Sequence, residues 1–151
     1  MANSTFRQTI KVTLGAPQIR LRFSNSFGLN AYTIDSVAIA LPVNGSAGVS
    51  SVKKGSLRAV TFNDGQSFIT ISKASSAVSD PISFPVKKGQ VLSISVYLKD
   101  GISGGAVTGH PGSRTDSWMT FGNQIQSLEL GGNLLSTAHW YVNPFRLPHR
   151  V

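Results

Sequence analysis

The segment that decides the fold reads Ile19-Arg20-Leu21-Arg22-Phe23-Ser24-Asn25-Ser26-Phe27-Gly28. Apolar and polar residues alternate over its first six positions, so one face is apolar and the other carries two guanidinium groups. A period of two is typical of a half-buried β-strand. Asn25 and Gly28 then supply turn chemistry, because glycine adopts a positive φ without steric cost. The segment therefore predicts a strand that runs into a turn.

The same alternation recurs along the chain. It is clearest in residues 91–99, where apolar side chains occupy every second position. Asn63-Asp64-Gly65 separates two further alternating segments and is a strong signal for a tight turn. This pattern predicts an all-β fold, namely a two-sheet antiparallel β-sandwich of jelly-roll type with about nine or ten strands.

One segment breaks the alternation. Apolar residues fall on one parity up to Ile34 and on the other parity from Val37 onward. One extra residue in a strand would produce this change. We therefore expect a β-bulge near Asp35 and Ser36.

Length and composition fit one domain. The chain has 151 residues, fifteen glycines, seven prolines and no cysteine, as expected for a β protein with frequent turns and no disulfide. We expect residues 1–142 to form the sandwich and residues 143–151 to form a C-terminal tail or a truncated linker. No apolar run is long enough to span a bilayer, and the first 20 residues lack the apolar region of a signal peptide.

The formal net charge of +8 indicates a preference for anionic partners. The basic residues are scattered, which argues against specific nucleic-acid recognition, and the only doublets are Lys53-Lys54 and Lys87-Lys88. Each doublet lies just before an alternating segment, where lysines commonly keep a sheet edge soluble. The alternative is that both doublets contribute to one anion-binding surface, with acidic polysaccharides among its ligands.

Several motifs resemble those of a known family in their amino-acid sequence and in their order along the chain. They are Arg-Leu-Arg-Phe-Ser-Asn-x-Phe-Gly at 20–28, His110-Pro111-Gly112-Ser113-Arg114-Thr115, Ser117-Trp118, Phe121-Gly122-Asn123 and Ala138-His139-Trp140-Tyr141. Together they resemble the N-terminal β-sandwich accessory domain of microbial GDSL-type (SGNH) hydrolases, which are carbohydrate-esterase-like proteins. The resemblance covers nearly the whole chain.

The motifs that carry catalysis in that family do not occur in this sequence. The family supplies its nucleophile from a Gly-Asp-Ser block and its base from a late Asp-x-x-His, whereas here Asp35-Ser36 follows Ile34 and Asp116-Ser117 follows Thr115. A serine hydroxyl is a weak nucleophile without a positioned base. The chain as given therefore resembles the accessory domain without its enzyme.

The resemblance implies a non-catalytic domain that binds carbohydrate, or that positions or caps an SGNH esterase domain. It implies an extracellular location, with a carbohydrate ligand and an SGNH catalytic domain as partners. The residues themselves indicate no cofactor, no specific nucleic acid and no membrane among the partners. One alternative is a free-standing lectin-like or effector-like protein that binds glycans. Another is a weak esterase built from His110, Asp116 and either Ser113 or Ser117, although closeness in sequence does not set triad geometry.

Three groups of residues are candidates for ligand binding. The first is the long glycine-rich loop 101–115 with His110, Ser113 and Arg114, because long loops in compact domains are often functional. These side chains could bind a ligand, brace the loop through its carbonyls or dock a neighbouring domain. Arg114 in particular could pair with a carboxylate or a sugar hydroxyl.

The second group is aromatic and comprises Trp118, His139 and Tyr141. Aromatic faces stack on the C–H surfaces of sugars while polar neighbours bind the hydroxyls. Parity places Trp140 in the core, and His139 and Tyr141 on the opposite face. The core is also the expected location of Trp118.

The third group is Arg20, Arg22 and Asn25 at the end of the first quoted strand. Two like charges on one strand face repel unless an acid or a ligand lies between them, and Asp35 is a candidate cross-strand acid. The chain has 14 basic and 6 acidic residues, so some bases remain unpaired. Three separated histidines and no calcium-loop spacing predict no metal site.

Overall fold

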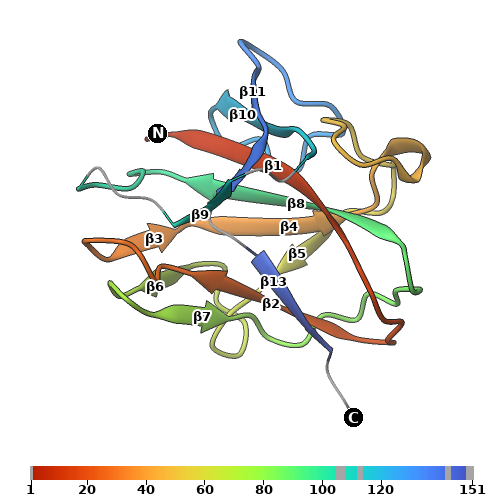
Figure 1. Cartoon of the computed structure of the whole chain (residues 1–151), viewed down its shortest axis with the longest axis horizontal. Helices are drawn as coiled ribbons and strands as arrows, with labels where there is room; N and C mark the ends of the chain where they lie inside the picture. Colours follow the sequence, from red (N-terminus) through yellow and green to blue (C-terminus); the bar gives the residue numbers. More distant parts are fainter. Residues whose placement is uncertain (1, 105–107, 112–113, 142–143, 149–151) are drawn as a thin grey trace.

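The fold is built from antiparallel strands in two layers. The computed structural model describes residues 2–104, 108–111, 114–141 and 144–148, with the side chains of residues 110–111, 140–141 and 144–148 outside the description. Figure 1 shows a large sheet in the upper half of the molecule and smaller sheets below it. The predicted all-β, sandwich-like fold is confirmed.

The larger layer is a six-stranded sheet with the order β11-β10-β1-β8-β4-β5. Its strands are β1 (Ser4–Lys11), β4 (Ser36–Ala40), β5 (Arg58–Val60), β8 (Val91–Leu98), β10 (Ser117–Phe121) and β11 (Leu135–Thr137). The two longest strands, β1 and β8, lie side by side at its centre, with Ser4 opposite Leu98 and Lys11 opposite Val91.

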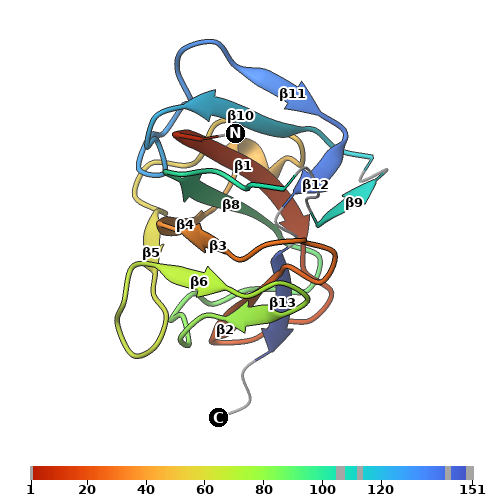
Figure 2. The same cartoon turned by 90° about the vertical axis from the view of Figure 1, so that its left-hand side faces the viewer.

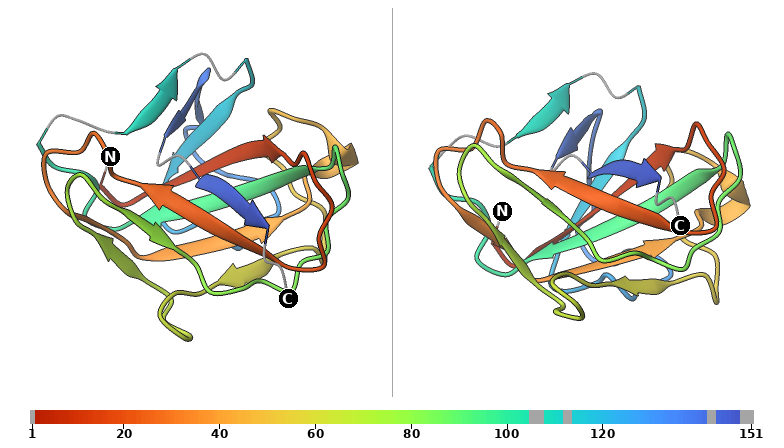
Figure 3. Two further views of the ribbon diagram at one scale, coloured as in Figure 1. Left: turned by 60° about the horizontal axis from the view of Figure 1, so that its bottom comes forward. Right: turned by 90° about the horizontal axis from the view of Figure 1, so that it is seen from below.

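The second layer consists of short strands in separate sheets. One sheet has the order β13-β2-β7, another pairs β3 with β6, and a third pairs β9 with β12. Their strands are β2 (Ile19–Ser24), β3 (Tyr32–Ile34), β6 (Ile69–Ile71), β7 (Ser76–Val78), β9 (Gly109–Pro111), β12 (His139–Tyr141) and β13 (Pro144–Pro148). Figure 2 shows β9 and β12 near the end of β10, and Figure 3 shows β2 and β13 crossing in front of the larger sheet.

Several of these strands are only three residues long. The described residues form thirteen strands, more than the predicted nine or ten, because short strands are counted separately. The fold is the same. The one helical element in the described part of the chain is a 3-10 turn, η1 (Val43–Gly45). Within the same residues, no helix has the length and apolar character needed to cross a membrane.

The core lies between the two layers and is formed by the alternating apolar residues. Ile19 and Phe23 of β2 and Leu92 and Ile94 of β8 are fully buried, as the alternation predicts. The rings of Phe23 and Phe62 pack with their centroids 5.9 Å apart. Burying one side chain of this size stabilises the fold by about 1.5–3 kcal/mol.

The change of parity after Ile34 has a different cause from the predicted β-bulge. Ile34 ends β3 in the second layer, whereas Ser36 begins β4 in the six-stranded sheet. Asp35 joins them: its N–H donates to Tyr97 O at 3.0 Å, and its carboxylate accepts the N–H of Lys99 at 2.7 Å. The chain changes layer at Asp35, so apolar residues on both sides point into one core.

Residues 144–148, which the sequence analysis placed in a C-terminal tail or truncated linker, form the strand β13. This strand pairs with β2, and Phe145 lies opposite Arg22. The segment alternates apolar and basic residues at 145–147, as a strand does. It has a proline at each end and lies at the edge of its sheet, where proline is tolerated.

The outer face of the six-stranded sheet is covered by two loops, residues 43–52 and 122–130, which meet at Arg7. The side chain of Arg7 is fully buried, at 0 % exposed. Its Nη1 donates to Ser50 O at 2.8 Å, and its Nη2 donates to Ser127 O at 2.7 Å. Burial lowers the pKa of Arg7 to about 10, so the guanidinium remains charged at neutral pH.

Further hydrogen bonds hold the same two loops to the sheet. The Nε of Arg7 donates to Ser95 Oγ on β8 at 2.8 Å. The N–H of Gly48 donates to Thr9 Oγ1 at 2.8 Å, and the N–H of Gln124 donates to Thr5 Oγ1 at 2.8 Å. Side chains on the outer face of β1 and β8 therefore act as anchors for both loops.

Candidate functional site

Asn25 lies inside the fold rather than on a ligand-binding surface. Its side chain is 1 % exposed, and Nδ2 donates to the backbone carbonyls of Asn30 at 2.9 Å, Ser72 at 3.1 Å and Ile71 at 3.2 Å. The amide thus ties the turn after β2 to the end of β6. The prediction of Asn25 as a ligand residue is wrong, because its donor group is engaged by backbone carbonyls.

Gly28 is required beside Asn25 for a steric reason. The turn predicted after β2 is present, but Gly28 is not among the residues with positive φ. A Cβ at position 28 would overlap the Oδ1 of Asn25. The close approach of a buried amide, and not a positive φ, therefore selects glycine here.

We predict that Asn25→Ala lowers the free energy of unfolding by about 2 kcal/mol, because three backbone carbonyls lose their donor. The midpoint of urea denaturation measures this loss, with an unchanged m-value. Asn133→Ala changes the same side chain at an exposed position and should cost less than about 0.5 kcal/mol. Equal losses in the two variants would contradict the structural role of Asn25.

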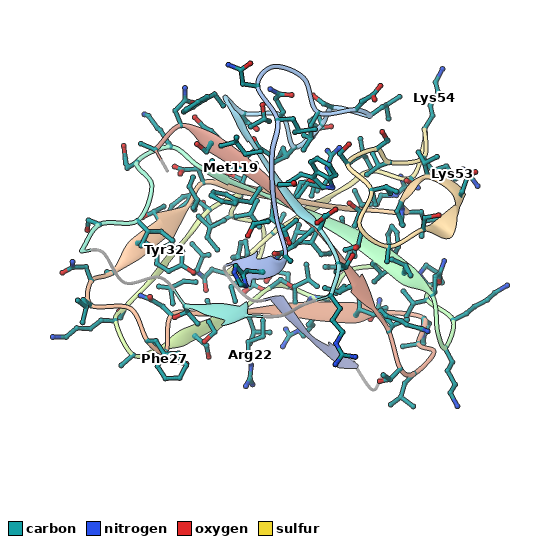
Figure 4. All side chains as sticks on the ribbon, turned by 45° about the horizontal axis from the view of Figure 1, so that its top comes forward. Arg22, Phe27, Tyr32, Lys53, Lys54 and Met119 are labelled. Atoms are coloured by element: carbon teal, nitrogen blue, oxygen red, sulfur yellow. The ribbon has the colours of Figure 1, made fainter. Side chains whose placement is uncertain are left out.

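Arg20 and Arg22 lie on the outer face of β2. Arg22 is exposed and Arg20 is half-buried. Asp35, the predicted cross-strand acid, accepts the N–H of Lys99 instead, because it lies where the chain changes layer. The pKa of Asp80 is lowered mainly by the hydrogen bond from Thr61, and the charge of Arg20 makes a smaller contribution in the same direction. Figure 4 shows Arg22 projecting away from the ribbon, so a ligand contact at Arg22 stays a prediction.

Asp80 closes the turn predicted at Asn63-Asp64-Gly65. Its Oδ2 accepts the hydroxyl of Thr61 at 2.7 Å and the N–H of Gly65 at 2.9 Å, and its Oδ1 accepts the N–H of Asp64 at 3.0 Å. The bond from Thr61 is the main reason that the pKa of Asp80 lies below its ordinary value. Asn63 and Asp64 have positive φ, so the carboxylate supports a backbone shape that few non-glycine residues adopt.

The lowered pKa of Asp80 predicts that this turn contributes stability that depends on pH. Because the folded state favours the ionised carboxyl, the contribution is fully present above the ordinary value of 3.8 and is lost as the pH falls through the lower folded-state pKa. Asp80→Asn should lower the melting temperature at neutral pH and remove this part of the acid sensitivity. Asp100→Asn, at an exposed position, is the matched control.

Thermal melts of the wild-type chain and both variants from about pH 2 to pH 7 make this comparison. The wild-type and Asp100→Asn curves should fall together in acid, and the Asp80→Asn curve should fall less. Three parallel curves would show that Asp80 does not contribute.

The predicted loop 101–115 is interrupted by a strand. Within it, β9 pairs with β12, and His110 lies opposite Trp140 in the register. Arg114 is exposed and has a φ of 57°. Ser113 and the side chain of His110 lie outside the described residues. Of this candidate group, the structure therefore describes only the side chain of Arg114, which is exposed.

The local esterase alternative is described only in part, because it also uses His110 and Ser113. Ser117 is 3 % exposed, and its Oγ has no hydrogen-bond partner among the described residues. Asp116 is exposed. A buried hydroxyl needs both access and a positioned base to act as a nucleophile. Neither is present around Ser117 in the described part of the chain.

Trp118 anchors a loop and does not lie in the core where the sequence placed it. It is half-buried on the outer face of β10, opposite Arg7 in the register. Its Nε1 donates to Gly48 O at 2.9 Å, which ties the loop 43–52 to β10. His139 is exposed on β12, and the side chain of Tyr141 lies outside the described residues.

The inner face of β10 and β11 carries an apolar surface. Met119 lies opposite Phe6 on one side and opposite Leu135 on the other, so all three side chains share this face. A cleft of about 230 Å³ is lined by Phe6, Ser117, Trp118, Met119, Leu135, Ser136 and Thr137. Phe121 on the same face is 65 % exposed, and Leu135 is 55 % exposed. We call Phe6, Met119, Phe121 and Leu135 the β10–β11 face; Figure 4 labels Met119.

Sequence reasoning did not single out this face. The signal was present, since Ser117, Met119 and Phe121 occupy alternate positions. Alternation shows which side chains share a face, but it does not show where the second layer ends. Beyond that boundary, inward-facing apolar residues are left exposed.

No protein-family model matches the chain, and no curated protein matches it significantly. Among the described residues, no group of three or more histidine, cysteine, aspartate or glutamate side chains could hold a metal ion.

Proposed function

We propose that this chain is a non-catalytic β-sandwich domain that positions a catalytic domain of the SGNH esterase type. The motifs of the sequence supply the expected partner, and the β10–β11 face supports docking. Contiguous exposed apolar side chains commonly mark an interaction surface. The observation that carries the proposal is the exposure of Phe121 and Leu135, at 65 % and 55 %, on the side of the sheet that faces the core.

The chemistry of this face favours a protein surface over a sugar. A sugar platform combines an aromatic face with several polar groups that bind hydroxyls. Here the indole N–H of Trp118 is already bonded to Gly48, and Phe121 and Leu135 present only carbon. Burying two such side chains contributes several kcal/mol to association before the costs of ordering.

A further feature fits a docked domain. The strand β11 lies at the edge of the six-stranded sheet, where backbone groups are available to another chain.

We predict that Leu135→Asp weakens binding to a separately expressed SGNH catalytic domain by at least about tenfold, because a carboxylate would be buried in an apolar contact. Isothermal titration calorimetry measures the affinity. Leu14→Asp introduces the same change at a similarly exposed leucine, 57 % against 55 %, in the turn after β1. It should bind as the wild-type chain does.

Two results would contradict the proposal. The first is a wild-type chain that does not bind the catalytic domain, or that binds it no better than Leu135→Asp does. The second is hydrolysis of p-nitrophenyl acetate that disappears in Ser117→Ala, because that would make the chain itself an esterase.

A further inference from the structure

Two adjoining clefts open at the end of the sandwich where β1 ends and β8 begins. The first has a volume of about 350 Å³ and is lined in part by Lys54, Arg58, Phe84 and Pro85. The second has a volume of about 460 Å³ and is lined in part by Val43 and Gln90. Leu41 and Lys53 line both clefts, so a single extended ligand can occupy the two.

The doublet Lys53-Lys54 lines these clefts, and the doublet Lys87-Lys88 lies in the turn that ends at Gln90, which lines the second cleft. Lys53 and Lys54 line the first cleft and project outward in Figure 4. Lys87 and Lys88 lie in the adjoining turn, in which Lys87 N–H donates to Gln90 Oε1 at 3.0 Å and Gln90 N–H donates to Lys87 O at 3.1 Å. We define the basic end by its six cations: Lys11, Lys53, Lys54, Arg58, Lys87 and Lys88.

The acidic residues lie elsewhere. Within the described residues, which include all six, no acidic side chain lines either cleft. Asp35 and Asp100 lie at the far end of β8, and Asp64 lies in the turn after β5, to which Asp80 is hydrogen-bonded. Asp116 and Glu129 lie beside the loop 43–52, with Glu129 opposite Ser51. The net charge of the chain is therefore concentrated as a positive potential at the basic end.

The cations around the first cleft sit on a braced turn. The hydroxyl of Ser56 donates to Lys53 O at 2.6 Å and accepts the N–H of Leu41 at 3.0 Å. Arg58 donates through Nη1 to Gly55 O at 3.0 Å and to Leu57 O at 2.8 Å. These bonds orient the guanidinium and leave Nη2 outside them, so its N–H groups can face an anion.

The residues that line the two clefts favour one class of anionic ligand over the others. Stacking on nucleic-acid bases needs an exposed aromatic face, but Phe84 is only 8 % exposed. Insertion into a membrane needs large exposed apolar side chains, and Val43, at 37 %, is the one such residue at these clefts within the described surface. Sugar rings with charged substituents need cations beside a modest apolar floor, which Leu41 and Pro85 supply.

We propose that the basic end binds a segment of an acidic polysaccharide. Carboxylate or sulfate groups lie on Lys53, Lys54 and Arg58, and the C–H faces of the sugar rings lie on Leu41 and Pro85. Lys87 and Lys88 bind further along the same chain of sugars. This inference is independent of docking at the β10–β11 face, because the two surfaces share no residue.

Titration calorimetry of the full chain with an oligogalacturonate tests the proposal. Lys53→Gln/Lys54→Gln should weaken binding about tenfold, and Lys87→Gln/Lys88→Gln about threefold, as expected for two exposed ion pairs in each case. Lys73→Gln/Lys99→Gln removes the same charge from the opposite end and should change the affinity less than twofold. These lysines are exposed in every pair, so each variant should fold.

Raising the salt concentration should weaken binding to the oligogalacturonate several-fold, and neutral maltohexaose should not bind. Equal loss in all three double variants would overturn the proposal, because binding would then follow net charge alone. Tighter binding to single-stranded oligothymidylate or to phosphatidylserine vesicles than to the oligogalacturonate would also overturn it. So would the absence of any binding to the wild-type chain at low salt.

Discussion

The buried guanidinium of Arg7 holds the outer half of this molecule together. A charged group that is removed from water is tolerated only when its donors are satisfied. The guanidinium of Arg7 donates to the hydroxyl of Ser95 and to the carbonyls of Ser50, Ser127 and, at 3.4 Å, Gln124. The planar fork of arginine can reach carbonyls in two loops and a hydroxyl on the sheet at the same time, whereas the single ammonium of lysine cannot.

Both proposed surfaces adjoin the loops that Arg7 fastens. The first loop leads through Val52, whose N–H donates to Leu128 O at 2.8 Å, directly into the turn that carries Lys53 and Lys54. The second loop follows Phe121 at the end of β10 and returns to β11. The sandwich core therefore fixes the sheet, and the contacts on its outer face fix the segments that flank the basic end and the β10–β11 face. A rigid support of this kind is what a binding surface on loops requires.

Period-two alternation predicts the all-β class and the inward faces of β2 and β8, because burial by a second layer is what selects apolar residues at every other position. The alternation also shows that the apolar parity changes near Asp35. It does not show the cause, because a β-bulge and a change of layer produce the same change of parity. Local patterns also fail where distant segments meet. The carbonyls bonded to Arg7, and two of the three bonded to Asn25, lie far along the chain. The sequence alone therefore predicts that both side chains are exposed. The exposure of the β10–β11 face cannot be predicted from local patterns either, because it depends on where the second layer ends.

Amide hydrogen exchange in Arg7→Met tests most directly whether this one side chain organises the outer face. The N–H groups of Gly48, Val52 and Gln124 are hydrogen-bonded in the loops, whereas that of Ile94 lies in the central strand β8. Loss of the guanidinium should speed exchange at the first three by about tenfold or more and leave exchange at Ile94 comparatively slow, because the loops open while the core sheet remains folded. Unchanged protection in the loops, or an equal loss at all four amides, would contradict this role of Arg7.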